Sequence, residues 1–373
     1  MTFTDTYGIK PESLSWEVPQ DFDARFTWTY SDDRKDLLAL YAKGKQKQWD
    51  AEHRIDWDQD IDYENPQGMP DELFALNGYA EYEKMSRAEK AEIRRNSQAW
   101  GLSQFLHGEQ GALICSAKIV TQVPDLEAKF YASTQTIDEA RHVEAYKRLL
   151  EKIGLSHPMT GPLKSLLEQV LRDSRWDMTY LGMQVVIEGL ALAAFAGIRD
   201  YSSSPLAAAV NAYVMEDEAR HVAFGRLTLR SYYPQLTEAE RREREEFLVE
   251  ACYHMRDRFE QRELWDHLGL DTEAAVQHMH ESAGTRQFRN HLFNRIVPIV
   301  KDIGLWGETV QKGYTDMGVL DYVNVDIDAL QANDEHIAAE FDARRKNINE
   351  VAAQFDAHHK NIEDVAALAT AAE

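Results

Sequence analysis

A six-residue motif that occurs twice carries the side chains best suited to chemistry in this chain. The residues Asp-Glu-Ala-Arg-His-Val stand at 138–143 and again at 217–222. In an α-helix, residues three apart lie on the same face, so the glutamate and the histidine of each copy direct a carboxylate and an imidazole toward one point. Each copy therefore forms half of a predicted metal site. The two pairs are Glu139 with His142 and Glu218 with His221.

Two further glutamates stand at matching places before the motifs. Glu109 lies 30 residues before Glu139, and Glu188 lies 30 residues before Glu218. The equal offsets predict two antiparallel helix pairs, each of which provides one glutamate and then one Glu-x-x-His. A lone glutamate from each of two helices, together with a Glu-x-x-His from each of two others, is the ligand set of dinuclear iron and manganese sites in helical bundles.

The charges of these groups agree with two divalent metal ions. The four carboxylates carry four negative charges, which two divalent cations neutralise, and neutral histidines add none. Glu188 lies in the apolar run 185–192, where an unpaired carboxylate costs several kcal/mol or shifts its pKa strongly. Metal ligation removes that cost and therefore favours Glu188 as a ligand.

Four long helices are predicted to position these residues. The first begins at Ser86, because Ser86 and Glu89 have the spacing of a capping box, and it ends before Pro124. The second is stopped by Gly154 and the fourth by Pro234. Since the connections are short and no alternating strand pattern is present, the predicted fold class is all-α, a four-helix bundle. The expected helices are 86–123, 125–152, 175–200 and, after the turn at 201–205, a helix that ends at 233.

The chain divides into four predicted parts. Residues 1–85 form an N-terminal extension, in which one helix that begins near Ser31 packs on the bundle. Residues 86–233 form the metal-binding bundle, and residues 234–333 add further helices to the same domain. Residues 334–373 form an amphipathic C-terminal helix.

The C-terminal part contains a second repeat. Ala-Ala-Glu-Phe-Asp-Ala at 338–343 returns as Ala-Ala-Gln-Phe-Asp-Ala at 352–357, fourteen residues later. Fourteen residues are two heptads, so the repeat predicts a coiled-coil-like seam against a partner helix.

The composition argues against several classes of protein. The 373 residues include 41 Lys and Arg against 64 Asp and Glu, a net charge of −23, which opposes binding to nucleic acid or to an anionic membrane. The two cysteines form no disulfide framework, and the first residues show no signal-peptide pattern, so we expect a cytoplasmic protein. The apolar stretch Leu181–Ile198 contains Gln184 and Glu188, and we interpret it as a buried bundle helix rather than a membrane span.

The two motifs and the two preceding glutamates together resemble the ferritin-like di-iron carboxylate superfamily, in particular its oxygen-activating branch. That branch includes the hydroxylases of bacterial multicomponent monooxygenases, the small subunits of ribonucleotide reductase and their ligand-binding oxidase relatives. The resemblance covers residues 86–233, with a looser likeness at Gln48-Trp49-Asp50. It implies two iron ions, or a Mn/Fe pair, with O2 as co-substrate. It also implies a homodimer and an external electron donor, either a reductase or a ferredoxin.

In the monooxygenase hydroxylases, residues beside the ligands form an outer shell, in which an aspartate holds each ligand histidine and an arginine braces the aspartate. Such contacts fix the tautomer of the histidine and raise its basicity. By this resemblance, the pairs are Asp138 with His221 and Asp217 with His142, and the bracing residues are Arg141 and Arg220.

Three positions bear on the choice of subfamily. Leu192 stands where the hydroxylases have a threonine, so their arrangement for proton delivery is not expected. Val214 stands where the arylamine N-oxygenases have an additional histidine, which argues against that subfamily. Tyr146 stands four residues after His142, where the ribonucleotide reductase small subunits have their radical tyrosine. The alternative interpretation of Tyr146 is a tyrosine that simply packs in the bundle.

We expect an O2-dependent di-iron oxidoreductase, similar to a monooxygenase, that hydroxylates, N-oxygenates or desaturates a small organic substrate. The first alternative is the generation of a radical for a partner enzyme, with Tyr146 as the redox residue. The others are iron handling or storage, and a structural bundle that holds no metal.

Overall fold

The computed structural model describes residues 2–30 and 32–344. The chain divides into two compact units, Met1–Ile327 and Asp328–Glu373. The first unit contains helices α1 to α15 and all of the predicted metal ligands. In the second unit, residues 328–344 are helical. The second copy of the C-terminal repeat, at 352–357, lies outside the described residues.

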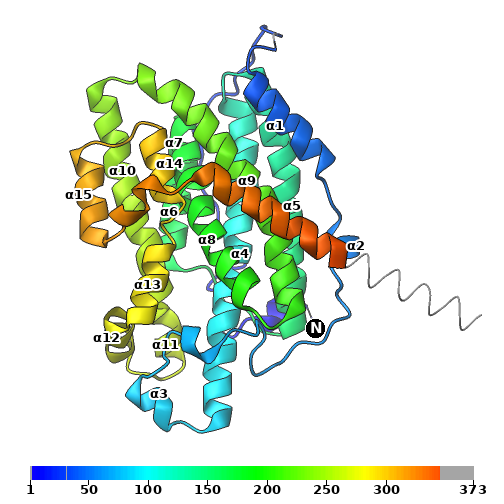
Figure 1. Cartoon of the computed structure of the whole chain (residues 1–373), viewed down its shortest axis with the longest axis vertical. Helices are drawn as coiled ribbons and strands as arrows, with labels where there is room; N and C mark the ends of the chain where they lie inside the picture. Colours follow the sequence, from blue (N-terminus) through cyan, green and yellow to red (C-terminus); the bar gives the residue numbers. More distant parts are fainter. Residues whose placement is uncertain (1, 31, 345–373) are drawn as a thin grey trace, which may run out of the picture. The chain divides into compact units, whose positions relative to one another are not determined.

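Four long helical segments run side by side in the first unit (Figure 1). Helix α4 packs along α5, α8 packs along α9, and α5 contacts α9. Because the connections within each pair are short, the paired helices are antiparallel. This arrangement confirms the predicted all-α bundle. The segments are α4 (Arg87–Gln122), α5 (Leu126–Ile153), the third segment formed by α7 (Trp176–Tyr180), η3 (Leu181–Ile187) and α8 (Glu188–Tyr201), and α9 (Pro205–Tyr232).

The ends of these helices follow from local chemistry that is visible in the sequence. The backbone N–H of Ser86 donates to Oε2 of Glu89 at 2.8 Å, and the N–H of Glu89 donates to Oγ of Ser86 at 3.3 Å. This reciprocal capping box satisfies two donors at the start of α4. Helix α5 ends at Gly154, whose φ of 71° lies in the left-handed region that glycine adopts without strain. Between the ends, side chains such as Leu149 and Phe224 are fully buried, and each contributes roughly 1.5–3 kcal/mol.

The third segment differs from the single α-helix that the sequence predicts. Residues Leu181–Ile187 form a π-helix, and the N–H of Glu188 bonds to the carbonyl of Met183, five residues back. A π-helical turn is rare, and it changes the direction in which the following side chains point. Glu188 is the first residue of α8, so the irregular turn immediately precedes a predicted metal ligand.

The N-terminal part lies against the bundle through two helices. Helix α1 (Lys35–Gln46) contacts α5 and α9, and the short helix α2 (Ala51–Arg54) contacts α5. The predicted start of the first helix near Ser31 is too early, because the helix begins at Lys35, and Ser31 itself lies outside the described residues. The connection between α1 and α2 contains Gln48 and Trp49.

The remaining elements of the first unit are short helices. In the described part of the chain we find no β-strand, only an isolated bridge between Tyr7 and Ser156. The elements are η1 (Phe3–Thr6), η2 (Asp71–Leu73), α3 (Ala80–Lys84), α6 (Gly161–Arg172), η4 (Tyr233–Gln235), α10 (Glu238–Asp257), η5 (Arg258–Glu260), α11 (Arg262–His267), α12 (Thr272–Glu281), α13 (Ala283–His291), α14 (Ile296–Asp302), α15 (Glu308–Met317) and η6 (Leu320–Asn324).

Among the described residues, one helical stretch, Trp176–Tyr201, is long and apolar enough to cross a membrane by length and composition. Of its most apolar window, 89% is buried inside the structure, where η3 and α8 pack against α9. The stretch is therefore a core helix of the bundle, as the sequence predicts.

Candidate metal centre

The six predicted ligands meet inside the four-helix bundle. They form two groups of four, and the potential ligand atoms of each group lie within 4.8 Å of one another. No ligand residue is more than 5% exposed. Glu139 and Glu218 belong to both groups, so each would offer ligand atoms to both metal positions. One group is Glu109, Glu139, His142 and Glu218, and the other is Glu139, Glu188, Glu218 and His221.

Each helical segment contributes to this site. Helix α4 provides Glu109, and the third segment provides Glu188. The other two helices, α5 and α9, each provide one complete Glu-x-x-His pair. The internal repeat in the sequence therefore corresponds to two helix pairs that face each other across the site.

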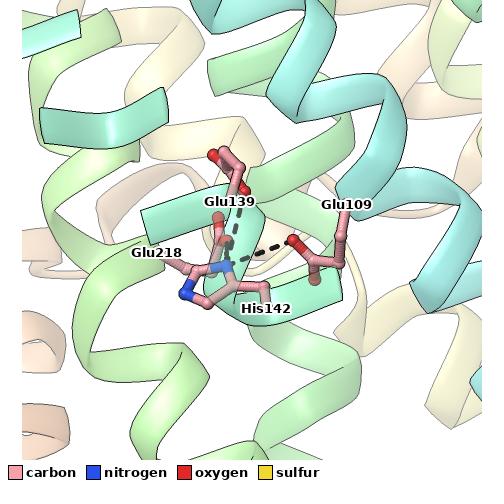
Figure 2. Close-up of side chains that lie close together, drawn as sticks. All are labelled: Glu109, Glu139, His142 and Glu218. Carbon is pink, nitrogen blue, oxygen red and sulfur yellow. Dashed lines mark hydrogen bonds and ion pairs between the residues drawn. The ribbon is translucent and has the colours of Figure 1, made fainter. Parts of the chain in front are cut away.

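In the first group, three carboxylates surround one ring nitrogen of His142 (Figure 2). The Nδ1 atom of His142 lies 3.2 Å from Oε2 of Glu109 and 3.0 Å from Oε1 of Glu218. It also lies 3.3 Å from Oε2 of Glu139. Three carboxylates and an imidazole nitrogen at these distances form a compact pocket of ligand atoms.

The second group repeats this arrangement around His221. The Nδ1 atom of His221 lies 3.0 Å from Oε1 of Glu139 and 3.4 Å from Oε2 of Glu218. In the described part of the chain, Oε2 of Glu188, both carboxylate oxygens of Glu218 and Nδ1 of His221 have no hydrogen-bond partner. Buried polar atoms without a partner are rare in proteins.

The opposite nitrogen of each histidine ring faces an aspartate. The Nε2 atom of His142 lies 3.1 Å from Oδ2 of Asp217, and Nε2 of His221 lies 3.2 Å from Oδ2 of Asp138. An ionised carboxylate only accepts hydrogen bonds, so Nε2 carries the proton. In the neutral ring the lone pair is then on Nδ1 and points into the ligand group. These are the contacts that the resemblance implies.

Two arginines join the two aspartates into one buried network. Arg141 contacts Asp138 and lies 2.8 Å from Oδ2 of Asp217. Arg220 contacts Asp217 and lies 3.8 Å from Oδ2 of Asp138. All four side chains are at most 7% exposed. Each histidine is thus held by an aspartate whose own charge is balanced by arginine.

The N-terminal part completes this network. The Nε2 group of Gln48 donates to Oδ1 of Asp138 at 2.7 Å, and Nε1 of Trp49 donates to Oδ2 of Asp217 at 2.7 Å. Arg141 in turn donates to Oε1 of Gln48 at 2.8 Å. The sequence offers only the looser likeness at these positions. Their roles follow from contacts between residues 90 and 168 positions apart, which no local pattern reveals.

The aspartates and the glutamates differ in how their charge is balanced. Burial raises the pKa of Asp217, but Arg220 and the hydrogen bond with His142 outweigh it, so this pKa lies well below its ordinary value. Burial raises the pKa of Glu109 and Glu188 well above the usual range, and the neighbouring Glu218 raises both further. The protein therefore supplies arginine cations to the aspartates, whereas the charges of Glu109 and Glu188 are not balanced by a cationic side chain in this way.

The pKa values of the two ligand histidines also show that the cluster favours added positive charge. Burial lowers the pKa of His142, but hydrogen bonds with Asp217 and Glu109 raise it well above its ordinary value of 6.5. The pKa of His221 is likewise raised against burial, by Glu139 and then by Glu218. In the absence of metal ions, protons are thus drawn into the cluster to balance its carboxylates.

These observations fit two divalent cations. The buried ligand atoms without partners provide lone pairs, and Glu109 and Glu188 lack the arginine partners that the aspartates have. Carboxylate oxygens and imidazole nitrogens together suit iron and manganese. Two such ions neutralise the four glutamates and replace the protons that the site otherwise takes up.

The predicted redox tyrosine lies beside the cluster. Tyr146 is fully buried, and its hydroxyl donates to Oδ1 of Asn211 at 3.1 Å. Burial raises its pKa well above the ordinary value, with further contributions from Glu109 and Glu218. Its ring lies 5.7 Å from both Phe105 and Phe195, centre to centre. Tyr146 therefore belongs to an aromatic wall next to the metal ligands.

One close neighbour of the ligands was not expected from the sequence. The Nε2 group of Gln135 donates to Oε1 of Glu139 and to Oε1 of Glu188, at 2.9 Å each. Gln135 stands four residues before Glu139, one helical turn away. A polar residue on the ligand face of α5 was therefore the signal that could have revealed it.

The model of one protein family matches most of this chain. The model described as p-aminobenzoate N-oxygenase AurF matches residues 31–304, which is well over half of the chain and includes the whole bundle. The chain belongs to this family. A comparison with curated proteins finds no match.

A comparison with solved structures finds oxidases. An R2-like ligand-binding oxidase with a Mn/Fe cofactor has a TM-score of 0.50 and 18% sequence identity, covering 74% of this chain and 97% of that chain. This likeness confirms the ferritin-like bundle. A Synechococcus protein with aldehyde deformylating oxidase activity has a TM-score of 0.44 and 14% identity, covering 60% of this chain and 97% of that chain.

Membership of the AurF family confirms the expected class, an O2-dependent oxidoreductase with a dinuclear metal centre that acts on a small organic molecule. The match to the AurF family contradicts the expectation, based on Val214, that the chain lies outside the arylamine N-oxygenases. Val214 is a single, fully buried position in α9, and an apolar residue there leaves the bundle and the six-ligand cluster intact.

Proposed function

We propose that the protein holds two iron ions at the six ligands and oxidises a small organic amine, the aromatic amines being the first class to test. The observation that carries this proposal is the pair of buried ligand groups that share Glu139 and Glu218. The description of the family supports an amine as the substrate. A Mn/Fe pair fits the same ligands.

When bound, the metal pair supplies the binding and reduction of O2, chemistry for which the protein side chains have no equivalent. Asp138 and Asp217 hold the ligand histidines in one tautomer and one orientation. Phe105 and Phe195, whose ring centres are 4.7 Å apart, pack with Tyr146 as buried apolar surface. Leu192 lies one turn after Glu188 and offers no hydroxyl group for proton transfer.

The stoichiometry of an N-oxygenation requires a partner. An amine and O2 give a hydroxylamine and water when two electrons and two protons are added. We therefore include an external electron donor, a reductase or a ferredoxin, in the proposal. We also propose a homodimer that works in the cytoplasm, without nucleic acid or membrane. The donor and the dimer are supported by the resemblance to oxygen-activating relatives.

The placement of Tyr146 supports a second candidate function, the generation of a stable tyrosyl radical. Its buried hydroxyl donates to Oδ1 of Asn211, and burial, with Glu109 and Glu218, raises its pKa. After exposure of the reduced iron protein to O2, a radical role predicts a tyrosyl signal in electron paramagnetic resonance that is absent in Tyr146→Phe. Loss of amine oxidation in Tyr146→Phe, without any such signal in the parent, would instead mean that Tyr146 supports the oxidation without forming a stable radical.

The primary experiment counts metal and then product. The protein is loaded with Fe(II) without oxygen, exposed briefly to O2 and desalted, and we expect about two irons per chain. A chemically reduced sample is then given O2 and p-aminobenzoate, and the N-oxygenated product is measured. A chain without iron contradicts the metal site. If the chain holds two irons and consumes O2 but oxidises none of a panel of amines, only the proposal of an amine substrate is contradicted.

A further inference from the structure

Gln135 connects the two ligand groups to each other. It lies on α5 and is fully buried. Its single amide nitrogen donates one hydrogen bond to Glu139, which belongs to both groups, and one to Glu188, which belongs only to the group of His221. Since carboxylates only accept hydrogen bonds, the NH2 side of the amide must face them. Both N–H groups of this amide are therefore used on metal ligands.

The orientation of this amide is set by two other elements. Nε2 of Gln184, in the π-helical turn η3, lies 3.5 Å from Oε1 of Gln135. Gln184 in turn packs against Gly225 of α9, where an added Cβ would lie 2.6 Å from Cβ of Gln184. The missing side chain at Gly225 thus gives Gln184 the room to approach α5. The oxygen of Gln135 faces Gln184, and its nitrogen faces the glutamates.

The internal repeat of the sequence is broken at this position. Gln135 stands four residues before Glu139, and the residue four before Glu218 is Val214. Both side chains are fully buried. The ligand motifs that follow are identical, but one is preceded by an amide and the other by an aliphatic side chain. The two halves of the site are therefore chemically different although their ligands are the same.

Resting on the proposed metal site, we propose that Gln135 is a positioning residue that makes the two metal positions unequal. By holding Oε1 of Glu188, it fixes the direction of that carboxylate and leaves Oε2, which has no hydrogen-bond partner among the described residues, for the metal beside His221. The first group contains Glu109 in place of Glu188. Gln135 therefore sets the affinity of one metal position far more than that of the other.

The test is a titration of the protein with Mn(II) alone, without oxygen, in which electron paramagnetic resonance measures free Mn(II). The parent should bind two ions. Gln135→Met keeps the length of the side chain and removes both donors, so we expect one of the two affinities to fall by about 10–100-fold. Gln122→Met is the matched control, because Gln122 is a buried glutamine of α4 that bonds to the carbonyl of Ser174.

A second pair of variants identifies the affected position. His221→Ala should abolish Mn(II) binding at the position next to Glu188. The Mn(II) affinity of the other position should then be the same with and without Gln135→Met. Two results would overturn the assignment. One is an equal fall in both Mn(II) affinities in Gln135→Met, and the other is a fall in the remaining affinity when Gln135→Met is added to His221→Ala. If Gln135→Met does not fold, Gln184→Met tests the same contact, with a smaller loss expected at the same position and no change counting against it.

These outcomes separate the two proposals. If the parent binds no metal, the proposed metal site fails, and the role of Gln135 fails with it. If the parent binds two ions and Gln135→Met binds them equally well, only the role of Gln135 fails.

Discussion

At the scale of single residues, the two glutamates that are shared by both ligand groups matter most. Glu109 and Glu188 each belong to one group, whereas Glu139 and Glu218 belong to both. Both oxygens of Glu218 lack a hydrogen-bond partner within the described ranges. Loss of either shared carboxylate therefore removes a potential ligand from both groups.

Removing Glu218 should empty at least one metal position. We expect Glu218→Ala to retain at most half of the iron of the parent after anaerobic loading and desalting, because both metals lose a ligand. Iron per chain, measured by elemental analysis, is the readout. The control is Glu144→Ala on α5, whose 44% exposed carboxylate pairs with Arg148. Equal iron in Glu218→Ala and the parent would remove Glu218 from the ligand set.

Removing Asp217 should cost stability as well as metal. Asp217 contacts Arg141, Arg220 and His142 and is fully buried. Asp217→Ala leaves two buried guanidinium groups with less compensation, and breaking a buried ion pair costs roughly 3–5 kcal/mol. Urea unfolding of the metal-free protein measures this difference.

The control for Asp217→Ala is a variant that removes one partner of an exposed ion pair. Glu64 and Arg87 lie 2.8 Å apart, with 51% and 87% of their side chains exposed. Glu64→Ala should therefore change the free energy of unfolding far less than Asp217→Ala does. A loss of the same small size in Asp217→Ala would mean that the arginines find other partners or water.

At the scale of helices, the packing of α9 against η3 decides where Gln184 lies. Gly225→Ala places a methyl group 2.6 Å from Cβ of Gln184, and such overpacking costs roughly 1–3 kcal/mol. We therefore expect a lower urea midpoint. Gly197→Ala in α8 is the matched control, because a Cβ there meets no atom within 4 Å, and alanine should raise helix stability by roughly 0.5–1 kcal/mol. A stabilised Gly225→Ala would show that Gln184 moves away at no cost.

The same scale shows what the sequence can and cannot predict. The helix ends at Ser86 and Gly154 depend on nearest neighbours and are predicted to within about two residues. The convergence of the four glutamates is also predictable, because it follows from the 30-residue offsets between the glutamates of each helix pair and from the Glu-x-x-His spacing. The π-helical turn before Glu188 is not, because its residues have the apolar pattern of an ordinary buried helix.

At the scale of the whole molecule, the site depends on parts of the chain that are far apart in sequence. Gln48 and Trp49 come from the N-terminal part, and they hold the aspartates of α5 and α9. The charge of the cluster likewise couples to the stability of the entire fold, because unfolding returns every buried ionisable group to water.

Several groups in the cluster shift stability in the same direction with pH. His142 and His221 have folded pKa values raised well above 6.5, so their stabilising protonation is complete below pH 6.5 and is lost as the pH rises through the folded values. Glu109 and Glu188, raised well above 4.5, act in the same sense. Asp217, whose pKa is lowered, acts oppositely, but only at pH values near and below 3.8.

The metal-free protein should therefore become less stable as the pH rises from 7 to 9. Over the same range the stabilisation by metal should grow, because bound divalent ions replace the protons that the cluster loses. Urea unfolding at pH 7, 8 and 9, with and without saturating Mn(II) and without oxygen, measures both quantities. Groups outside the cluster titrate in both samples and cancel in the difference. A gain from metal that is constant across this range would show that the cluster carries no protons when it is empty, and the cation-deficient site inferred from Glu109 and Glu188 would be wrong.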